Sequence, residues 1–554
     1  MAKAESILDL IDVKFQDATN HVSFTSDDIM GLVMPYFWGE ADKMRVHNKT
    51  TFYEMYPESL PIGVSGLTDN DRDLYSAYAQ VKAYFAHGGG QIEVYRPSSG
   101  FKYQQMSISA SGTSEGASMT MADNQHDETA ALSVALKYAG FVPQSMAVGY
   151  SNIQIKVEST ELKGYDGADQ CLKISVQGVK ASDNSIVDLE VFEGSTNPLA
   201  NIDGESIYLE NVVNSNFIDV KVFGVVTAMA SAITKTCNEY VNSGNTPNVV
   251  LDDNADNVIA NGVLDAYKYF RDFEVSNATL IINPFVKSTI ACYGEIDDAI
   301  GSLVEYRKNV QGVIGYPINL DYDYDTIESY FVSGNGGVSS NAKGNKFCIA
   351  LQGREIISLF GYRYTLNCVA GYCGKMINVA KEAHLNQIAS GYIYGIYGGS
   401  LKESLLSGDV IELMEKGVNS VFTSKRGNII WGTRTMYSKQ SSYFGKANVM
   451  RVCSAILKNI FPIAIETLHT DAASNPITRA SVSTMLNSII DTFISSQDLH
   501  ADSYADCSDS INTDYLTKGG TILNVILVLH FIGLVERVSI KIIATDTSVS
   551  AEFV

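Results

Sequence analysis

Two segments of this chain repeat the order helix then strand: GVLDAYKYFRDF (262–273) before ATLIINPF (278–285), and STIACYGEIDDAIGSLVEYRKN (288–309) before VQGVIGYPI (310–318). Helices that alternate with short apolar strands favour a mainly parallel sheet, because parallel neighbours need a crossover connection that packs on the sheet. The expected fold is therefore mixed α/β, with a helix-covered sheet as its core.

The same order occurs nearer the N-terminus. Apolar residues recur at steps of three and four from Leu74 to Phe85, which is the helical period. Gly88, Gly89 and Gly90 end this helix, and QIEVYRP (91–97) follows as a strand. We expect residues 26–100 to form the first part of the core.

Between about Phe101 and Gly224 the pattern changes to short alternating runs: IQIKVES, LKISVQG, VDLEVFEG and FIDVKVFG. Alternation of apolar and polar residues is typical of half-buried strands, and turn residues separate the runs. This region predicts an antiparallel β-rich insertion that faces outward from the core.

The second half returns to helices and strands. DVIELMEKG predicts a helix that ends at Gly417, and SVFTSKRGNIIWGTRT predicts a hairpin that turns at Gly427 and has IIWGTRT as its second strand. The apolar run TILNVILVLHFIGLV (521–535) is shorter than the roughly 20 residues of a spanning helix, so we expect a buried strand. Residues 225–535 are the expected second part of the core.

Both ends of the chain look like arms. Residues 1–25 are weakly amphipathic and are either an arm or a first helix. Residues 536–554 predict one alternating strand and a second short strand, which either return to the chain's own sheet or pair with a neighbour. In the second case the subunit-contact residues are Val538, Ile540, Ile542, Val549 and Phe553.

Composition limits the function classes. The 554 residues are 45% hydrophobic and 18% charged, which fits three to five domains or one large core with insertions. A net charge of −22 argues against broad binding of a nucleic-acid backbone. The eight scattered cysteines are expected to be free thiols, and no secretion signal is visible.

Motifs for chemistry are weak. Cys368 and Cys373 supply at most half a zinc site, and the eight histidines include no pair at metalloprotease spacing. DYDYD (321–325) lacks the glycine and terminal glutamate of a calcium loop. We expect no catalytic residues, no metal and no cofactor.

Four stretches, in order, resemble the tail sheath proteins of contractile-tailed bacteriophages. SAYAQVKAYFAHGGGQIEVYRP ends at Arg96 and Pro97, and ATLIINPF and RKNVQGVIGYP contain Pro284 and Pro317. LMEKGVNSVFTSKRGNIIWGTRTM contains a Gly-Val-Asn turn at 417–419 and the family's core motif. The residues of this motif are Trp431, Gly432, Arg434 and Thr435. YADCSDSINTDYLTKGGTILNVILVLHFIGLVERVSIKI resembles the family's closing strands.

Two positions depart from the family pattern. TLNC (365–368) stands before Ala370 and Gly371, where the family has a Pro-Pro-Ser-Gly run, and a frequent arginine pair is a lone Arg451. The contacts that those residues make in the family are therefore not expected to carry over unchanged.

The resemblance implies a structural subunit that polymerises as stacked hexameric rings around a tail tube and contracts to drive the tube through the host envelope. Implied partners are further copies of the chain, the tail tube protein, and baseplate and tail terminator proteins, with no direct nucleic acid and no membrane insertion. The location would be the virion tail, after assembly in the host cytoplasm.

Three alternatives stay open. One is the sheath of a phage-derived injection particle or bacteriocin. Another is an α/β hydrolase-like enzyme that uses an acid of DYDYD, which predicts a deep polar pocket with perturbed carboxylates. The third is a receptor-binding module carried by the β-rich insertion.

Overall fold

A computed structural model describes residues 28–60, 73–237, 258–532, 540–544 and 549–553, apart from residues 37, 40, 102, 115–118, 123, 138–141, 143, 166–170, 228, 334–336, 440 and 513–521. The expected N-terminal arm, residues 1–25, lies outside the described residues, as does Val538.

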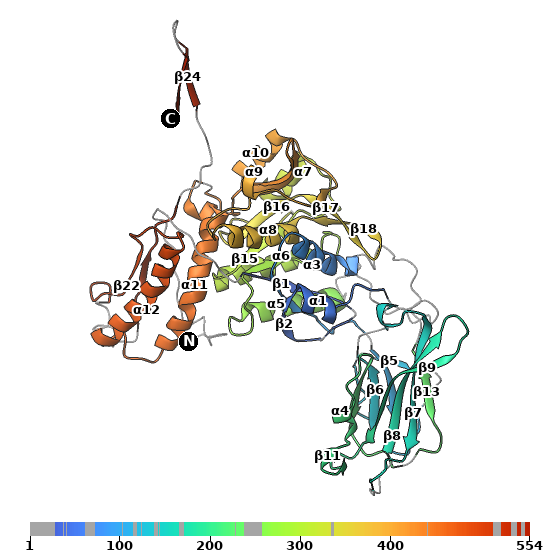
Figure 1. Ribbon diagram of the computed structural model, residues 1–554. Coiled ribbons are helices and arrows are strands. Elements are labelled where there is room, and N and C mark those ends of the chain that lie inside the picture. The colour runs from blue at the N-terminus through green and yellow to red at the C-terminus, as the bar shows by residue number, and fades with distance from the viewer. Residues whose placement is uncertain are drawn as a thin grey trace.

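The core contains an eight-stranded sheet of mixed direction (Figure 1). Six central strands are parallel, and one antiparallel strand lies at each edge. In spatial order the strands are β2 (Met44–Asn48), β3 (Gln91–Tyr95), β1 (Ile29–Val33), β14 (Leu280–Ile282), β15 (Gln311–Gly315), β16 (Cys348–Gln352), β20 (Val418–Ser424) and β21 (Gly427–Trp431). The expected helix-covered mixed sheet is confirmed.

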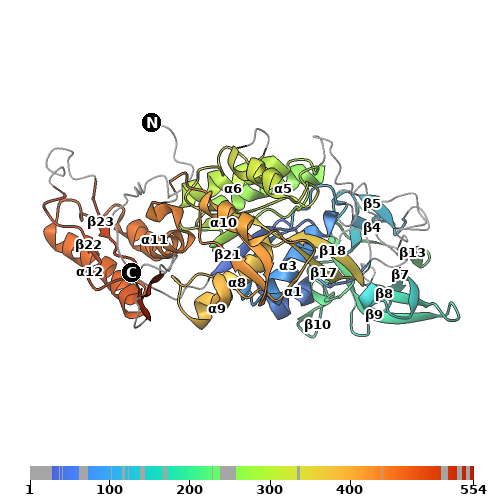
Figure 2. The same ribbon diagram turned by 90° about the horizontal axis from the view of Figure 1, so that it is seen from above.

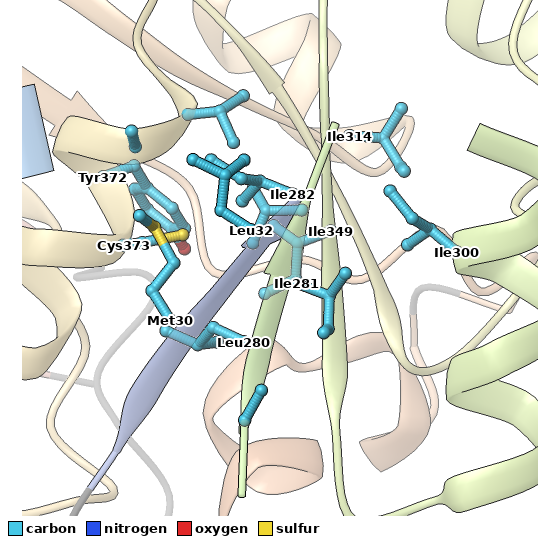
Figure 3. Close-up of a cluster of buried hydrophobic side chains, with 14 of the residues drawn as sticks. Met30, Leu32, Leu280, Ile281, Ile282, Ile300, Ile314, Ile349, Tyr372 and Cys373 are labelled. Atoms are coloured by element: carbon cyan, nitrogen blue, oxygen red, sulfur yellow. The ribbon is translucent and has the colours of Figure 1, made fainter. Parts of the chain in front are cut away.

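Helices cover both faces of this sheet (Figure 2). On one face α3 (Ser76–Ala86) packs on α8 (Val369–Glu382), and on the other α5 (Val258–Arg271) packs on α6 (Tyr293–Arg307). Figure 3 shows the result: Tyr372 and Cys373 of α8 lie on one side of the strands, and Ile300 of α6 lies on the other. Parallel strands buried on both faces explain why ATLIINPF reads as a continuous apolar run.

Glycines allow α3 and α8 to approach closely. A Cβ at Gly374 would lie 2.3 Å from the carbonyl oxygen of Tyr84, so a larger residue would push the helices apart. The glycine turn after α3 behaves as expected: Gly88 has a φ of +90°, and the Gly89 amide donates to the Tyr84 carbonyl at 3.0 Å.

The insertion is a sandwich of two four-stranded antiparallel sheets with its own apolar core. The strands of the first sheet are β12 (Ile218–Val222), β6 (Leu132–Leu136), β4 (Tyr103–Ile108) and β5 (Thr120–Ala122). Those of the second are β13 (Ile233–Thr236), β7 (Tyr150–Thr160), β8 (Cys171–Lys180) and β9 (Ile186–Ser195). Because β13 pairs with β7, the sandwich extends beyond the expected limit at Gly224.

A C-terminal part lies at the opposite end of the main sheet from the sandwich (Figure 1). It contains α11 (Ala447–Thr467), α12 (Pro476–Ser495), and a small sheet of β22 (Tyr504–Asp506) and β23 (Ile526–Val528). Among the described residues α11 alone is long and apolar enough for a membrane span. However, 61% of its most apolar 18-residue stretch is buried inside the protein, as in a core helix.

Shorter elements connect these parts. They are α1 (Lys49–Met55), η2 (Gln144–Met146), β10 (Asn201–Ile202), β11 (Glu205–Ser206), α4 (Leu209–Val212), α7 (Tyr324–Glu328), the π-helical turn η3 (Ser329–Ser333), β17 (Arg354–Leu359), β18 (Tyr362–Asn367), α9 (Gly391–Tyr394), β19 (Ser400–Leu401), α10 (Ser407–Glu415) and η4 (Tyr443–Gly445). The chain's last described elements are β24 (Ile540–Ala544) and β25 (Val549–Phe553).

Two expectations were wrong. The strand expected through IIWGTRT ends at Trp431, because Gly432 has a φ of +126° and turns the chain away. Of the run 521–535 the structure describes residues 522–532; within these, β23 is a strand of three residues, and all side chains except Phe531 are half-buried or exposed. Hydropathy alone therefore overstated the burial of this run.

Candidate assembly interface

The C-terminal strands pair with each other. β24 and β25 form an antiparallel hairpin with Ile540 opposite Phe553 and Ala544 opposite Val549. The hairpin forms a two-stranded sheet of its own and lies apart from the rest of the described protein in Figure 1. It has not returned to the main sheet, which was one of the two alternatives for residues 536–554.

Within the described part of the chain, the hairpin has no third strand. β24 and β25 pair with each other, and neither pairs with a strand of the main sheet or of the β22–β23 sheet. An isolated two-stranded hairpin is marginally stable in water, so we expect it to need a partner.

The small β22–β23 sheet has one closed edge and one open edge. Ala505 of β22 donates its amide to Asn487 Oδ1 at 2.9 Å and accepts from Asn487 Nδ2 at 3.0 Å. Leu527 of β23 is opposite Ala505. Because the amide and carbonyl of Ala505 are directed at Asn487, this is a non-hydrogen-bonded pair, in which the amide and carbonyl of Leu527 also point away from the partner strand. No described residue bonds to the outward amide and carbonyl of Leu527, so β23 can accept another strand.

The outer face of the same sheet is apolar and exposed. Tyr504 and Ile526 are each 48% exposed, and Ile522 and Val525 lie beside them along the chain. Contiguous exposed apolar surface on a soluble protein marks an interaction site. An open strand edge next to such a face is suited to receive a strand from another chain.

Asp28 and Ile532, the first and last residues of the described body, are both held by contacts to the first turns of α11. Asp28, where the described chain begins, accepts a hydrogen bond from Arg451 Nε at 3.0 Å, and both side chains are buried. Arg451 Nη1 also donates to the Met376 carbonyl at 3.1 Å. The lone arginine noted in the sequence therefore anchors the start of β1 to α8 and α11.

Ile532 is held through Asn448, three residues before Arg451. Asn448 donates to Asn386 Oδ1 at 2.6 Å, and Asn386 Nδ2 donates to the Ile532 carbonyl at 3.2 Å, just before the C-terminal strands. The Asn386 amide also donates to Asp498, whose burial raises its carboxyl pKa to about 8. Sequence reasoning missed Asn386, Asn448 and Asp498, because no spacing rule links residues so far apart.

The core motif is held against the β16 and β20 strands by hydrogen bonds from Asn419. Asn419 donates from Nδ2 to the carbonyls of Ala350 at 2.9 Å and Arg434 at 2.8 Å, and its Oδ1 accepts from the Arg434 amide at 2.8 Å. A Cβ at Gly432 would lie 2.5 Å from Asn419 Oδ1, so only glycine fits there.

The rest of the motif leads to α11. Thr435 donates from Oγ1 to the Phe444 carbonyl at 2.6 Å, and its amide donates to Gly445. Trp431 is half-buried and contacts Tyr392 edge-on, with ring centroids 6.1 Å apart. Trp431, Gly432, Arg434 and Thr435 thus connect the β20–β21 hairpin to the segment before α11.

The place where an enzyme with this topology binds its ligand is filled by side chains. Ligands of open α/β sheets bind beyond the carboxyl ends of the strands, where the strand order reverses, here between β1 and β14. Beyond β14, Gln80 Nε2 donates to the carbonyls of Asn283 and Pro284 at 3.0 and 2.8 Å, and Ser76 Oγ donates to Pro284 at 2.9 Å. These contacts fix α3 across the crevice.

The acids of DYDYD serve local structure. Asp323 caps α7 by accepting from the Thr326 amide at 2.9 Å, and this bond lowers its carboxyl pKa. Asp321 and Asp325 are exposed. Among the residues that the structure describes, no cluster of His, Cys, Asp or Glu is arranged to hold a metal ion.

Comparisons with known proteins agree on the fold. No protein-family model matches the chain, and no curated protein matches it. A sheath tail protein from Listeria innocua is 13% identical, with 89% of this chain and 90% of that chain covered and a TM-score of 0.52. A chain of the anti-feeding prophage baseplate is 11% identical, with 97% and 99% covered and a TM-score of 0.51.

The chain therefore has the fold of sheath tail proteins, in agreement with the resemblance of its four sequence stretches. The similarity spans the chain from the core through the insertion and the C-terminal part.

Proposed function

We propose that this protein is the structural subunit of a contractile tail sheath. Copies polymerise as stacked hexameric rings around a tail tube, and contraction of the stack drives the tube through the envelope of a host cell. The observation that carries this proposal is the C-terminal hairpin, which lies apart from its own body on a chain with the sheath tail fold.

Strand exchange between subunits gives the hairpin its role. One copy's arm adds to the open edge of β23 in a neighbour and covers the exposed Tyr504 and Ile526. Backbone hydrogen bonds at these crossings persist while the rigid bodies rotate between two packings. The hydrogen bonds that hold Asp28 and the Ile532 carbonyl keep each arm attached to its own body under load.

The energy for contraction is conformational. The extended stack assembles in a metastable arrangement, and a signal from the baseplate releases it to an arrangement that buries more surface. The further partners are the tube protein and baseplate and terminator proteins. The sheath belongs to the tail of a virion and assembles in the host cytoplasm.

A second candidate is the sheath of a phage-derived injection particle or bacteriocin. The similarity to a chain of the anti-feeding prophage baseplate, over almost its whole length, favours this candidate. The two candidates differ in what lies above the tail. Micrographs of native particles with DNA-filled heads support a phage tail, and headless particles support an injection device.

The insertion is proposed as an outward decoration. Its sandwich has its own apolar core, separate from the core around the main sheet. Replacing residues 104–236 by a flexible linker is therefore expected to leave polymerisation intact. If instead this variant assembles normally but the particle no longer attaches to cells, the insertion is a receptor-binding module.

Electron microscopy of the purified full-length chain tests the proposal. We expect rings or tubes from the intact chain, and soluble folded monomers from a variant that ends at residue 539. The linker variant of the insertion is the matched control, because it removes a larger piece without touching either arm. A full-length chain that stays monomeric at high concentration contradicts the sheath function, and truncated chains that build normal tubes contradict the role of the hairpin.

A further inference from the structure

Positive charge is concentrated in one segment of this acidic chain. Residues 340–446 contain 13 lysines and arginines against 6 acids, a net charge of +7, whereas the remainder of the chain carries −29. Like charges repel when many copies pack together, so an assembly of this chain needs contacts between unlike regions. The basic segment is the natural counterpart of the rest.

Exposed apolar residues gather in the same segment. Ile393 of α9 is 77% exposed and Leu406, next to α10, is 76% exposed, with Tyr392 and Ile396 also exposed. Lys425 and Arg426 lie at the turn of the β20–β21 hairpin. The guanidinium carbon of Arg426 lies 5.0 Å from the centroid of the Tyr392 ring. We name this surface the α9 face; it comprises Tyr392, Ile393, Ile396, Leu406, Lys425 and Arg426.

Local contacts place these residues together. The Thr423 amide donates to Ser404 Oγ at 2.8 Å, which brings the segment before α10 against the β20–β21 hairpin. The Ile430 amide donates to the Gly395 carbonyl at 2.7 Å, and the Tyr397 amide donates to Asn428 at 2.9 Å. These bonds close the edge of β21, so the α9 face recognises a partner through side chains and not through an added strand.

The composition of the face is that of an interface centre. Tyrosine, tryptophan and arginine dominate binding energy at protein interfaces, where rigid aromatic groups lose little entropy. Here Arg426 lies over the Tyr392 ring and Trp431 meets that ring edge-on, and Ile393 and Leu406 are exposed in the same segment. Within the described part of the chain, neither Lys425 nor Arg426 forms an ion pair with a carboxylate, so both charges remain available.

We propose that the α9 face docks on an acidic surface of a second copy of this chain, as a side-chain contact distinct from the strand exchange of the arms. The inference rests on the proposed sheath function and adds the location of a contact between subunits. Charge complementarity within the same chain selects the partner, since the acids lie almost entirely outside the basic segment.

A charge-reversal pair tests the proposal in the full-length chain. The variant K425E/R426E reverses two charges on the α9 face, and K343E/K439E reverses two exposed charges elsewhere in the basic segment, for the same net change. Sedimentation velocity at low and high salt measures self-association, and circular dichroism checks folding. We expect the first variant to weaken self-association by about tenfold or more and the control to change it less than about threefold.

Each outcome is decisive. Normal association of K425E/R426E overturns the α9 contact while leaving the sheath function intact. Equal weakening by both variants shows a bulk charge effect and also overturns it. A wild-type chain that never associates overturns both the contact and the sheath function.

Zero-length carbodiimide cross-linking identifies the occupant. In assemblies of mixed light and 15N-labelled chains, we expect Lys425 to link to aspartates or glutamates of another copy. Links from Lys425 confined to its own chain contradict the proposal.

Discussion

The main sheet and the C-terminal part differ in how far their strand edges and apolar faces are covered by the chain itself. The eight-stranded sheet is covered by helices on both faces, and its β21 edge is closed by residues 395–397. The β22–β23 sheet and the β24–β25 hairpin have only two strands each, and the β22–β23 sheet exposes Tyr504 and Ile526. We therefore propose that the main sheet is complete in the monomer and that the C-terminal part is completed by neighbours.

The largest effect is expected where the arm is anchored to the complete region. Asp28→Ala leaves Arg451 buried without its carboxylate, which should cost about 3–5 kcal/mol of unfolding free energy. In the C-terminal part, Arg479 is also buried, but it keeps its hydrogen bonds to the Ala472 and Ala473 carbonyls when the largely exposed Asp509 is removed, so Asp509→Ala should cost less, about 1–3 kcal/mol. Urea unfolding followed by circular dichroism compares the two variants.

Equal losses in these two variants would contradict the distinction between the regions. A small loss for Asp28→Ala alone would show that the start of β1 is not anchored through Arg451.

The junction between the regions should respond to pH. Burial raises the pKa of Asp498 to about 8, so the folded protein holds a proton that the unfolded chain releases near its ordinary pKa of about 4. Its contribution to stability is full below about pH 4 and is lost as pH rises towards 8, by up to about 1.4 kcal/mol per pH unit.

Asp498→Asn keeps the size of the side chain and removes this titration. Stability measured by urea unfolding between pH 5 and 8 should fall less steeply in the variant than in the wild type. Parallel curves would show that Asp498 is ionised in the folded protein and would contradict a pKa raised by burial.

A smaller effect is expected at the edge of β22. Asn487→Ala removes both hydrogen bonds to Ala505, which should cost about 1–2 kcal/mol and open a second strand edge. Hydrogen exchange at the Ala505 amide should speed up in the variant, with Asn428→Ala as the control at the closed edge of the main sheet. Unchanged exchange at Ala505 would mean that another group closes this edge.

The smallest effect on the monomer is expected at the exposed face. Tyr504→Ser and Ile526→Ser should change unfolding free energy by no more than about 0.5 kcal/mol, because both side chains are already half in solvent. Light scattering should nevertheless show weaker polymerisation. A variant that loses stability without losing assembly would place these residues in the monomer core.

The sequence predicted the complete region better than the incomplete one. The alternation of residues 262–318 and the turn at Gly88–Gly90 arise from local patterns, and the structure confirms them. The run 521–535 looked buried because hydropathy does not tell whether the partner of an apolar strand lies in the same chain.

The anchors could not be predicted for a related reason. Asn386 meets Ile532 across 146 residues, and Arg451 meets Asp28 across 423 residues. Such pairs depend on tertiary packing and leave no periodic signal in the sequence. Gly432 was found as part of a motif, but its turn away from the strand follows from its contact with Asn419.

Hydrogen exchange of the full-length chain, as monomers and as assembled tubes, tests most directly whether neighbours complete the C-terminal part. The account predicts that the amides of Leu527 and of residues 540–553 exchange rapidly in the monomer and become strongly protected in the tubes, while those of β14–β16 are protected in both. Amides of Leu527 and residues 540–553 that are already protected in the monomer, or that still exchange rapidly in the tubes, would contradict it.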